Sequence, residues 1–466
     1  MPVPVPGRVC TEDAPDTAAQ TCARFRVALS PLRPYRAPYM RSVGLDFGTT
    51  NSAIGVADGA GVKLARFSHA QGTTDTFRSI LHFHPDVRDK TGKYVAACGP
   101  RAIDRYLEAS GRGRLIQSLK SYVADRGFQA TSIFSRTHSL VDLLTILLAD
   151  LRARAEEELG PLGSRIVVGR PVNFAHASAP EDEALAIERL RAALGKVGWT
   201  DVLFEHEPVA AAYYYEKQLT EDELVLIADF GGGTSDFTLI DVGPSRSTRA
   251  DGKSAILGTD GVGLAGDALD SKVLHNVVAP QLGLGSTYRA MFGRELDVPV
   301  WIYSRLRRWH HLSFLKTKKN VELLEEIASQ SDEPEKIRAL LHILDYDLGY
   351  HLYQAVERAK VELSTKEETR FSFSDPPLRI EAQITRAQFE GWVEEETTAM
   401  AECVDRLLAS TGIPASSVDR VFMTGGTSFV PAVRRIFDER FGKEKIRAGG
   451  EMISVATGLA LRALDP

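Results

Sequence analysis

The stretch Leu226–Ile240, LIADFGGGTSDFTLI, decides the fold of this chain. An apolar run rich in branched residues, Leu224–Ala228, predicts a buried strand that ends at Asp229. Three glycines follow at Gly231–Gly233, and the chain becomes extended again from Ser235. The pattern predicts a hairpin whose tip has little side chain. Because glycine lets backbone N–H groups approach an anion closely, this tip is suited to a phosphate.

Two carboxylates, Asp229 and Asp236, flank the tip. At about 4 Å, two like charges near a protein surface repel by roughly 4 kcal/mol. A divalent cation bound through carboxylate and phosphate oxygens reverses that sign, and Mg²⁺ is usually held in this way. The hairpin therefore predicts a phosphate site for a magnesium nucleotide.

The same pattern occurs earlier in the chain, at Val43–Asp58, VGLDFGTTNSAIGVAD. Asp46 and Asp229 lie 183 positions apart, which is the length of a domain. Two matched hairpins at this separation predict a duplicated, two-lobed protein that closes on one ligand. The alternative is a pair of unrelated hairpins.

The two hairpins resemble the paired phosphate loops of the actin, hexokinase and heat-shock-seventy ATPase superfamily, and DFGTTNS with DFGGGTSDF is most similar to the DnaK-type chaperones. The resemblance implies an α/β, actin-like ATPase fold with two duplicated ribonuclease-H-like lobes around a nucleotide cleft. Residues 41–225 would form the first lobe and 226–466 the second, with a divergent helical subdomain at about 267–365. The implied ligands are ATP or ADP and Mg²⁺.

Composition is that of a globular chain, with 466 residues of which 44% are hydrophobic and 25% charged. A net charge of −6 argues against general nucleic-acid binding. The four cysteines lie far apart without metal-ligand spacing, which favours reduced cytosolic thiols. The longest apolar helix, Leu140–Leu151, is too short to span a bilayer, and Ser139 and Asp142 suit an N-cap at its start. We expect a cytoplasmic protein that binds neither nucleic acid nor membrane.

Residues 1–40 are proline-rich, lack periodicity and contain no apolar segment of a secretory signal. We expect a disordered extension there, and we hypothesise that translation starts at Met40.

Two polar residues in the first half of the chain, Lys120 and Glu207, also fit a nucleotide-phosphate site. Lys120 lies where a basic loop, Arg112–Asp125, enters an apolar turn, and without context it would be a solvated lysine. In the resembled family, a lysine at this place reaches the region of the γ-phosphate. Pro208 suits the first turn of a helix and holds Glu207 at its start, facing the cleft. The alternative for Glu207 is an acid that only stabilises the helix dipole.

The segment Gly261–Gly266, GVGLAG, matches a dinucleotide-binding pattern after the apolar strand AILG. No acid lies about 20 residues beyond Gly266, where a ribose partner would be needed, which argues against the dinucleotide interpretation. The resemblance instead implies that Gly266 begins a helix that contacts the nucleotide phosphates.

A long periodic helix is predicted over Glu335–Ser364, and its last part, VERAKVELS, resembles the segment that brackets the nucleoside in the family. Glu357, Lys360 and Ser364 share one face of such a helix. After it, Thr385 and Gln388 form a plausible capping box for the next helix.

The last strong motif is Asp419–Phe437, DRVFMTGGTSFVPAVRRIF, in which a strand meets a double glycine and Pro431 opens a helix. In the resembled proteins such a backbone lies against adenine and ribose. Where the chaperones place arginines on the base, this chain has Val361 and Phe429, which predicts nucleotide affinity without cation–π help. We assign to the adenine and ribose end of the nucleotide the residues Gly425, Gly426, Thr427 and Phe429.

The roles that the resemblance implies complete the site. The phosphate cradle consists of Gly48, Thr49, Thr50, Asn51, Gly231, Gly232, Gly233 and Thr234. Asp46 and Asp236 hold hydrated Mg²⁺ through waters. Lys120 neutralises charge on the transferred phosphoryl group. Glu207 and Asp229 orient the attacking water, with Thr234 within proton-relay reach. The predicted activity is slow ATP hydrolysis.

Other functions stay open. The chain could be a nucleotide-dependent binding switch that uses a basic segment, Arg305–Lys319, to meet an unknown protein partner, or a small-molecule kinase or filament former of the same superfamily. His82 and His84 alternate on one strand and could bind a metal. No G-x-x-x-x-G-K-[ST] occurs, which excludes a P-loop enzyme. The sequence stops soon after the ATPase-like motifs, so we expect no peptide-binding domain, as in the YegD-type branch of the family.

Overall fold

The computed structural model describes residues 41–58, 61–70, 72–109, 112–216, 219–245, 255–290, 293–306, 312, 315–346, 348–447 and 454–464. The chain divides into two units, Met1–Tyr39 and Met40–Pro466. The predicted extension 1–40 lies outside the described residues, and so do residues 307–311, 313 and 314 of the basic segment.

The first large sheet has the strand order β13-β12-β1-β2-β3. Its strands are β1 (Ser42–Phe47), β2 (Asn51–Asp58), β3 (Gly61–Leu64), β12 (Arg165–Arg170) and β13 (Asp201–His206), with β6 (Phe77–Arg78) added beside β2. Strands β1, β2 and β3 are antiparallel neighbours, whereas β1, β12 and β13 run parallel to one another. Parallel strands are buried between covering layers, in agreement with the apolar run of β12.

The second large sheet repeats this plan, with the order β16-β15-β14-β21-β22. Its strands are β14 (Glu223–Phe230), β15 (Ser235–Val242), β16 (Ala255–Val262), β21 (Arg420–Thr424) and β22 (Ile446–Arg447). Strands β14, β15 and β16 are antiparallel neighbours, and β14, β21 and β22 run parallel. Both predicted hairpins, β1–β2 and β14–β15, thus occupy the same place in two sheets of equal topology.

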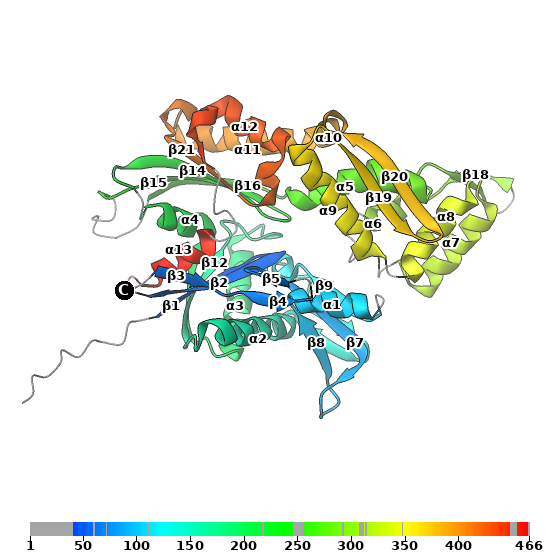
Figure 1. The fold of residues 1–466 in the computed structure, drawn as a ribbon, viewed down its shortest axis with the longest axis horizontal. Helices are drawn as coiled ribbons and strands as arrows, with labels where there is room; N and C mark the ends of the chain where they lie inside the picture. Colours follow the sequence, from blue (N-terminus) through cyan, green and yellow to red (C-terminus); the bar gives the residue numbers. More distant parts are fainter. Residues whose placement is uncertain are drawn as a thin grey trace, which may run out of the picture. The chain divides into compact units, whose positions relative to one another are not determined.

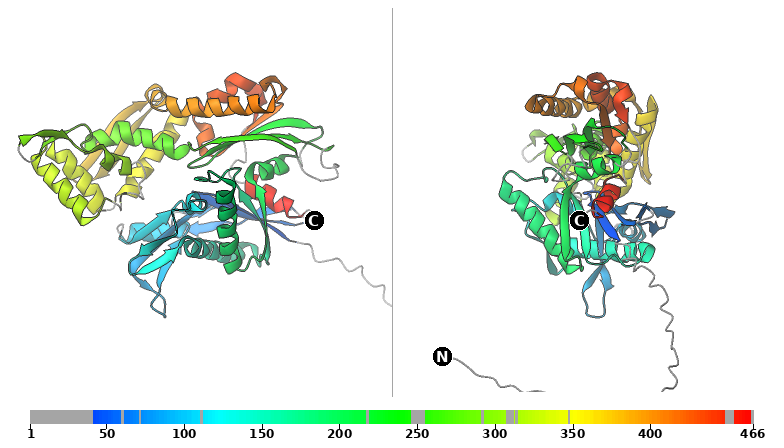
Figure 2. Two further views of the ribbon diagram at one scale, coloured as in Figure 1. Left: turned by 180° about the vertical axis from the view of Figure 1, so that it is seen from behind. Right: turned by 90° about the vertical axis from the view of Figure 1, so that its left-hand side faces the viewer.

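Helices α2 (Leu140–Leu159) and α3 (Pro180–Lys196) pack on the first sheet and can be followed from behind in Figure 2. The predicted start of α2 is confirmed, because the hydroxyl of Ser139 accepts the backbone N–H of Asp142 while the Asp142 carboxylate accepts the N–H of Ser139. Gly160 ends the helix at φ 76°.

Two helices lie between the two large sheets, α4 (Glu207–Glu216) and α13 (Ser454–Arg462) (Figure 1). Val167 of β12 packs with Ala210 of α4 and Leu459 of α13, while Ala212 of α4 packs with Ile227 of β14. A Cβ on Gly458 would collide with the backbone of Ala210, so this glycine allows the helices to touch. The contacts join both sheets through one pair of helices.

The chain between β16 and β21 is mainly helical. It contains α5 (Gly266–Val273), the π-helical turn Leu274–Val278, the 3₁₀ turn Ala279–Leu282, α6 (Val300–Leu306), α7 (Lys318–Gln330), α8 (Pro334–Asp345), α9 (Gly349–Thr365), α10 (Arg386–Trp392) and α11 (Glu394–Thr411), with the small strands β17 (Thr287–Arg289) and β18 (Glu295–Asp297) and the hairpin β19 (Glu368–Asp375)–β20 (Leu378–Thr385). The capping box of Thr385 and Gln388 is present at the start of α10.

The prediction of one helix over Glu335–Ser364 is wrong. Helix α8 ends at Asp345, Tyr346 leaves the helical conformation, and α9 starts afresh at Gly349. Aspartate favours turns and glycine favours helix ends. These local preferences interrupt the helix although the helical spacing of apolar residues continues.

The remaining described elements are smaller. They are β4 (Phe67–His69), β5 (Gly72–Thr74), β7 (Ile80–Arg88), β8 (Tyr94–Cys98), α1 (Pro100–Glu108), β9 (Arg114–Gln117), the 3₁₀ turn η1 (Leu119–Tyr122), β10 (Ala130–Ile133), β11 (Arg136–Ser139), the 3₁₀ turns Ala415–Ser417, Gly426–Phe429 and Lys443–Lys445, and α12 (Pro431–Phe441).

Candidate functional site

The tips of the two hairpins face each other. A Cβ added to Gly232 would lie 2.5 Å from Oγ1 of Thr50 and 3.5 Å from Oδ1 of Asp267. The N–H of Asp267, at the start of α5, donates to the carbonyl of Gly232 at 2.9 Å. A side chain at position 232 would therefore close the space between the tips, which only glycine leaves open.

Neighbouring residues fix the shape of the first tip. Ser79 donates its hydroxyl to the carbonyl of Gly48 at 2.7 Å and its N–H to the carbonyl of Thr50 at 2.9 Å. Arg78 donates to Oδ1 of Asn51 at 3.4 Å. Thr49, between these anchored positions, is partly exposed. Sequence reasoning missed Ser79 and Arg78, because their link to the hairpin is a tertiary pairing of β6 with β2.

Backbone contacts shape the second tip. The N–H of Gly231 donates to the carbonyl of Thr234 at 2.9 Å, which closes the turn. A Cβ on Gly233 would meet no atom of the described residues within 4 Å, so this glycine lies at the open side of the tip. The exposed Gly231 and Gly233 and the partly buried Gly232 present their backbone with no side chain of their own.

Lys120 and Glu207 form a buried ion pair. The ammonium of Lys120 donates to Oε1 of Glu207 at 2.5 Å, and their side chains are only 6% and 12% exposed. The predicted helix start is present, since α4 begins at Glu207 with Pro208 in its first turn. Gly169 of β12 makes room for the acid, because a Cβ there would lie 3.0 Å from Cγ of Glu207.

A cluster of carboxylates surrounds this pair. Burial raises the pKa of Asp46 to about 8, helped by the charges of Glu207 and Asp229 and opposed by Lys120. Burial, Asp229 and Glu207 raise the pKa of Asp236 to about 7, again against Lys120. With all groups ionised, four carboxylates face one ammonium, so the cluster has an excess of negative charge that a cation would relieve.

Asp229 and Asp236 lie directly opposite each other in the β14–β15 pair. Burial and then the charge of Glu207 raise the pKa of Asp229, while a hydrogen bond from the hydroxyl of Thr424 lowers it. The hydroxyl of Thr234 donates to Oδ2 of Asp236 at 3.0 Å. Sequence reasoning missed Thr424, although its place at the end of a strand before a double glycine was a usable signal.

A second group of predicted residues meets at Gly266. A Cβ on Gly266 would lie 3.2 Å from Oγ1 of Thr427, 3.6 Å from Nζ of Lys360 and 3.8 Å from the carbonyl oxygen of Gly231. Residues separated widely in the sequence are thus brought together beside the second hairpin.

Lys360 has a buried partner that sequence reasoning missed. Its ammonium contacts the Asp270 carboxylate at 2.8 Å, and that side chain is 1% exposed. Tyr353 also donates to Asp270, at 3.1 Å. Burial raises the pKa of Asp270, which Lys360 opposes and the nearby charge of Glu357 reinforces. Ser364 donates its hydroxyl to the carbonyl of Lys360 at 3.1 Å, so it stabilises the helix locally.

The double glycine Gly425–Gly426 has a backbone conformation and surroundings that favour glycine. Gly425 adopts φ +83°, and a Cβ there would collide with the carbonyl of Phe230. Gly426 is exposed, while Phe429 and Val361 are large apolar side chains with 53% and 59% exposure. The two apolar side chains therefore leave surface available to a ligand.

The predicted histidine site has a different role. His82 is 2% exposed, its Nε2 is 3.0 Å from the carbonyl oxygen of Arg112, and its ring packs edge-on to Tyr106. Among the described residues, no group of three or more His, Cys, Asp or Glu has the arrangement of a preformed metal site. Since Mg²⁺ keeps several waters and binds through one or two carboxylates plus phosphates, Asp46 and Asp236 still suit it.

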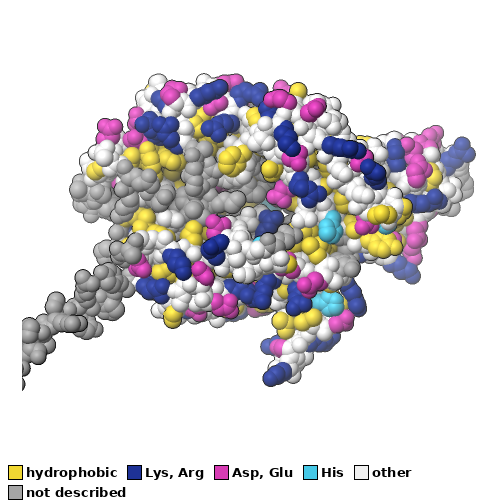
Figure 3. Space-filling model, viewed as in Figure 1, with side chains coloured by type: hydrophobic (Ala, Val, Ile, Leu, Met, Phe, Trp, Pro, Cys, Tyr) yellow, Lys and Arg dark blue, Asp and Glu magenta, His cyan; other side chains and the backbone are white. Residues whose placement is uncertain are grey.

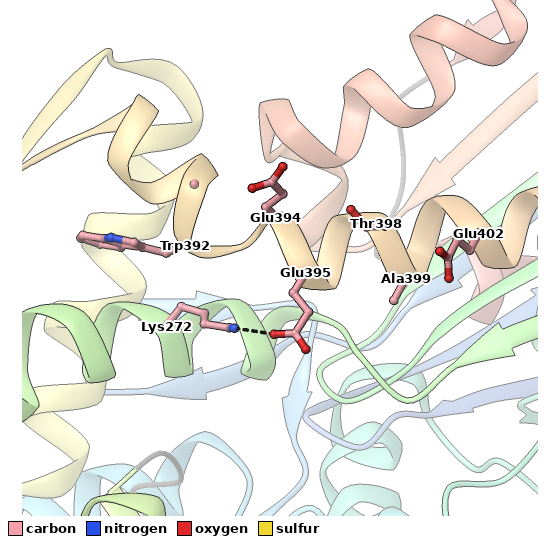
Figure 4. A pocket seen from close by; sticks show the side chains of 8 residues that line it. Lys272, Trp392, Glu394, Glu395, Thr398, Ala399 and Glu402 are labelled. Atoms are coloured by element: carbon pink, nitrogen blue, oxygen red, sulfur yellow. Dashed lines mark hydrogen bonds and ion pairs between the residues drawn. The ribbon is translucent and has the colours of Figure 1, made fainter.

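A separate hollow of about 640 Å³ lies between α5, α10 and α11, and its lining contains none of the predicted site residues. Figure 4 shows Lys272 from α5 paired with Glu395 of α11 at its edge, beside Trp392. Lys272 also contacts Glu396 at 3.0 Å. Charged side chains of both signs are interspersed over the described part of the face in Figure 3.

Comparison with known proteins finds similarity to one family of chaperones. A family model described as "Hsp70 protein" matches residues 335–464. The chaperone protein DnaK of Thermus thermophilus is 24% identical over 443 residues, with 91% of this chain and 60% of the relative covered. The DnaK of Deinococcus proteolyticus is 24% identical over 448 residues, covering 91% and 59%. The chain spans about 60% of the length of these curated relatives.

These similarities support an Hsp70-like ATPase relationship. The predicted fold class is confirmed: two sheets of the same mixed topology, joined by helices, form the actin-like ATPase fold. Within the described part of the chain, none of the helices has the length and apolar character needed to cross a membrane.

Proposed function

We propose that this protein binds ATP with Mg²⁺ and hydrolyses it slowly, as a chaperone-like ATPase. One observation carries the proposal: two glycine-tipped hairpins of equal topology face each other beside four carboxylates and a buried lysine. A polyanion alone would be repelled by these acids. A polyanion that brings a divalent cation would be attracted.

The hairpins would hold the phosphates. Backbone N–H groups of Gly48–Asn51 approach from one side and those of Gly231–Thr234 from the other. Asp46 and Asp236 would hold the hydrated Mg²⁺, which when bound neutralises phosphate charge and orients the phosphate chain. The fit rests on the donor set, because both aspartates belong to a cluster in which four carboxylates face one ammonium, and carboxylate oxygens are ligands that Mg²⁺ uses.

The remaining residues act on water and on developing charge. Lys120 stabilises negative charge on the transferred phosphoryl group, and Glu207 keeps its ammonium in place through the 2.5 Å pair. Asp229 orients the attacking water, with one carboxylate oxygen fixed by Thr424. Thr234 relays a proton beside Asp236. Positioning and electrostatics supply most catalysis of phosphoryl transfer.

The nucleoside would lie at the group formed by Gly266, Lys360 and Thr427. Glu357 and Ser364 share that side of α9, and the exposed backbone of Gly425 and Gly426 would meet adenine and ribose. Val361 and Phe429 offer apolar faces to the base without a cation, so we expect modest affinity.

The proposal keeps the division into a first lobe, residues 41–225, and a second lobe, 226–466, that close on one nucleotide. It covers nucleotide chemistry only. Because the chain spans about 60% of the matched relatives, peptide binding is not part of it. The cytoplasmic location and a protein partner stay predictions.

Calorimetric titration of the full chain with ATP and ADP, each with and without Mg²⁺, tests the proposal. We expect one site whose affinity falls at least tenfold when Mg²⁺ is removed. Phosphate release without an added acceptor should accompany ATP binding and separates a hydrolase from a kinase. Absence of heat with either nucleotide would refute the proposal.

A further inference from the structure

Lys120 lies in a short turn that has little regular structure of its own. The 3₁₀ turn Leu119–Tyr122 is followed by an irregular segment that reaches Gln129, before β10 begins at Ala130. A lysine that must hold one position against a reacting phosphate needs its backbone fixed from outside this segment.

That support comes from Arg189 of α3. Its two terminal nitrogens contact four backbone carbonyl oxygens at 2.9–3.1 Å, those of Tyr122, Val123, Asp125 and Phe128. Arg189 is 7% exposed. A buried guanidinium is costly unless it is well hydrogen-bonded, and here the irregular backbone satisfies it.

A second contact fastens the same segment to the same face of the helix. Arg126 donates to Oδ1 of Asp182, whose other oxygen accepts backbone N–H groups of Ser178 and Ala179 at the start of α3. Asp182 and Arg189 are seven residues apart, so they lie on one helix face. Both are buried.

The order of elements along the chain links the contacts of Arg189 to Glu207, the partner of Lys120. Helix α3 leads directly into β13, and β13 ends where Glu207 begins α4. One continuous stretch, Pro180–Glu207, therefore holds the turn that carries Lys120 and also supplies its partner.

We propose that Arg189 is a positioning residue that fixes Lys120 against Glu207 by clamping the segment Tyr122–Phe128 to α3. The catalytic consequence rests on the proposed function, whereas the clamp itself does not. Arg189→Lys keeps the charge but loses the planar fork that reaches several carbonyls. Arg191→Lys is the matched control on the same helix, because Arg191 donates to Val202 of β13 and not to the turn.

The test is amine acetylation of the full chain, read by peptide mass spectrometry, with the paired Lys360 as internal reference. Arg189→Lys should raise the labelling rate of Lys120 about tenfold relative to Lys360, and Arg191→Lys should leave it unchanged. In the same preparations, we expect kcat for phosphate release to fall about tenfold in Arg189→Lys with little change in KM.

Unchanged Lys120 labelling in Arg189→Lys, or an equal rise at Lys360, would overturn the clamp. If Arg189→Lys does not fold, Arg126→Gln removes the exposed fastening and should raise Lys120 labelling about threefold; no rise would also overturn it. If the labelling responds as expected but the parent protein releases no phosphate, the positioning stands and the proposed function fails.

Discussion

The hairpins β1–β2 and β14–β15 occupy equal places in two sheets, yet their acids differ. In the first, Asp46 lies opposite Ala53; in the second, Asp229 lies directly opposite Asp236. Like charges in such a pair are destabilising unless something neutralises them. The repeated topology thus supplies a common frame, and the second hairpin places two of the four acids directly opposite each other.

The tips also differ in what holds them. Ser79 ties the first tip through Gly48 and Thr50, whereas a backbone hydrogen bond from Gly231 to Thr234 closes the second. The first tip therefore depends on side chains and a neighbouring strand, and the second depends on backbone hydrogen bonds, within the tip and from Asp267 to Gly232.

The largest expected effect is at Lys120, the single lysine drawn into this otherwise acidic cluster of described residues. Lys120→Ala should lower single-turnover ATP hydrolysis about 100-fold, because one preorganised charge at a transition state is commonly worth that much. Lys63→Ala is the control, since Lys63 is 65% exposed in a surface pair. Hydrolysis at the parental rate in Lys120→Ala would remove this residue from the mechanism.

The next largest effect concerns the two hairpin tips, which should differ in how well they tolerate a methyl group added to a glycine. In Gly48→Ala the new Cβ would collide with the carbonyl of Asn51, whereas in Gly233→Ala it would meet nothing within 4 Å in the part of the chain that the structure describes. We expect Gly48→Ala to cost about 2 kcal/mol of unfolding free energy, as overpacking typically does, and Gly233→Ala to be nearly neutral. Chemical denaturation without nucleotide measures both, and equal stabilities would contradict the described tip.

The sequence predicted some features of the fold and the site but not others. It predicted both hairpins, the α2 cap and the start of α4, because each depends on neighbours within a few residues. It could not reveal Ser79 or Asp270, whose roles arise from contacts between distant segments. Thr424 was missed although its place before a double glycine was a usable signal. The break between α8 and α9 was missed because apolar periodicity continues across it.

Asp46 of the first hairpin and Asp236 of the second predict a pH dependence of stability for the protein kept free of divalent cations. Unfolded aspartates ionise near their ordinary pKa of 3.8, but folded Asp46 and Asp236 keep protons until about 8 and 7. The folded state then binds more protons between these limits, so stability falls as pH rises from about 4 to 8. The Tm measured in EDTA should follow this trend.

Asp236→Asn should flatten the part of that slope below about pH 7 and raise Tm by a few degrees at pH 8. Asp241→Asn, on the same strand but opposite Leu224, is the control and should leave the slope unchanged. A slope of the opposite sign, or no response to Asp236→Asn, would show that these raised pKa values do not lower the stability of the cation-free protein.

The smallest effect is expected away from the hairpins. Val361→Arg would add a cation beside the base, where cation–π contacts give about 0.5–1 kcal/mol, so ADP affinity should rise about threefold. Pyrophosphate affinity, which reports the two tips alone, should not change. An equal gain for both ligands in calorimetry would instead indicate a general charge effect.

Hydrogen exchange of the two tips, with and without Mg²⁺ and ATP, tests the central claim most directly. The account predicts that the amides of residues 48–51 and 231–234 become protected together and at the same nucleotide concentration, and only with Mg²⁺. Protection of one tip alone, or of neither, would contradict the claim that the paired hairpins hold one polyanion.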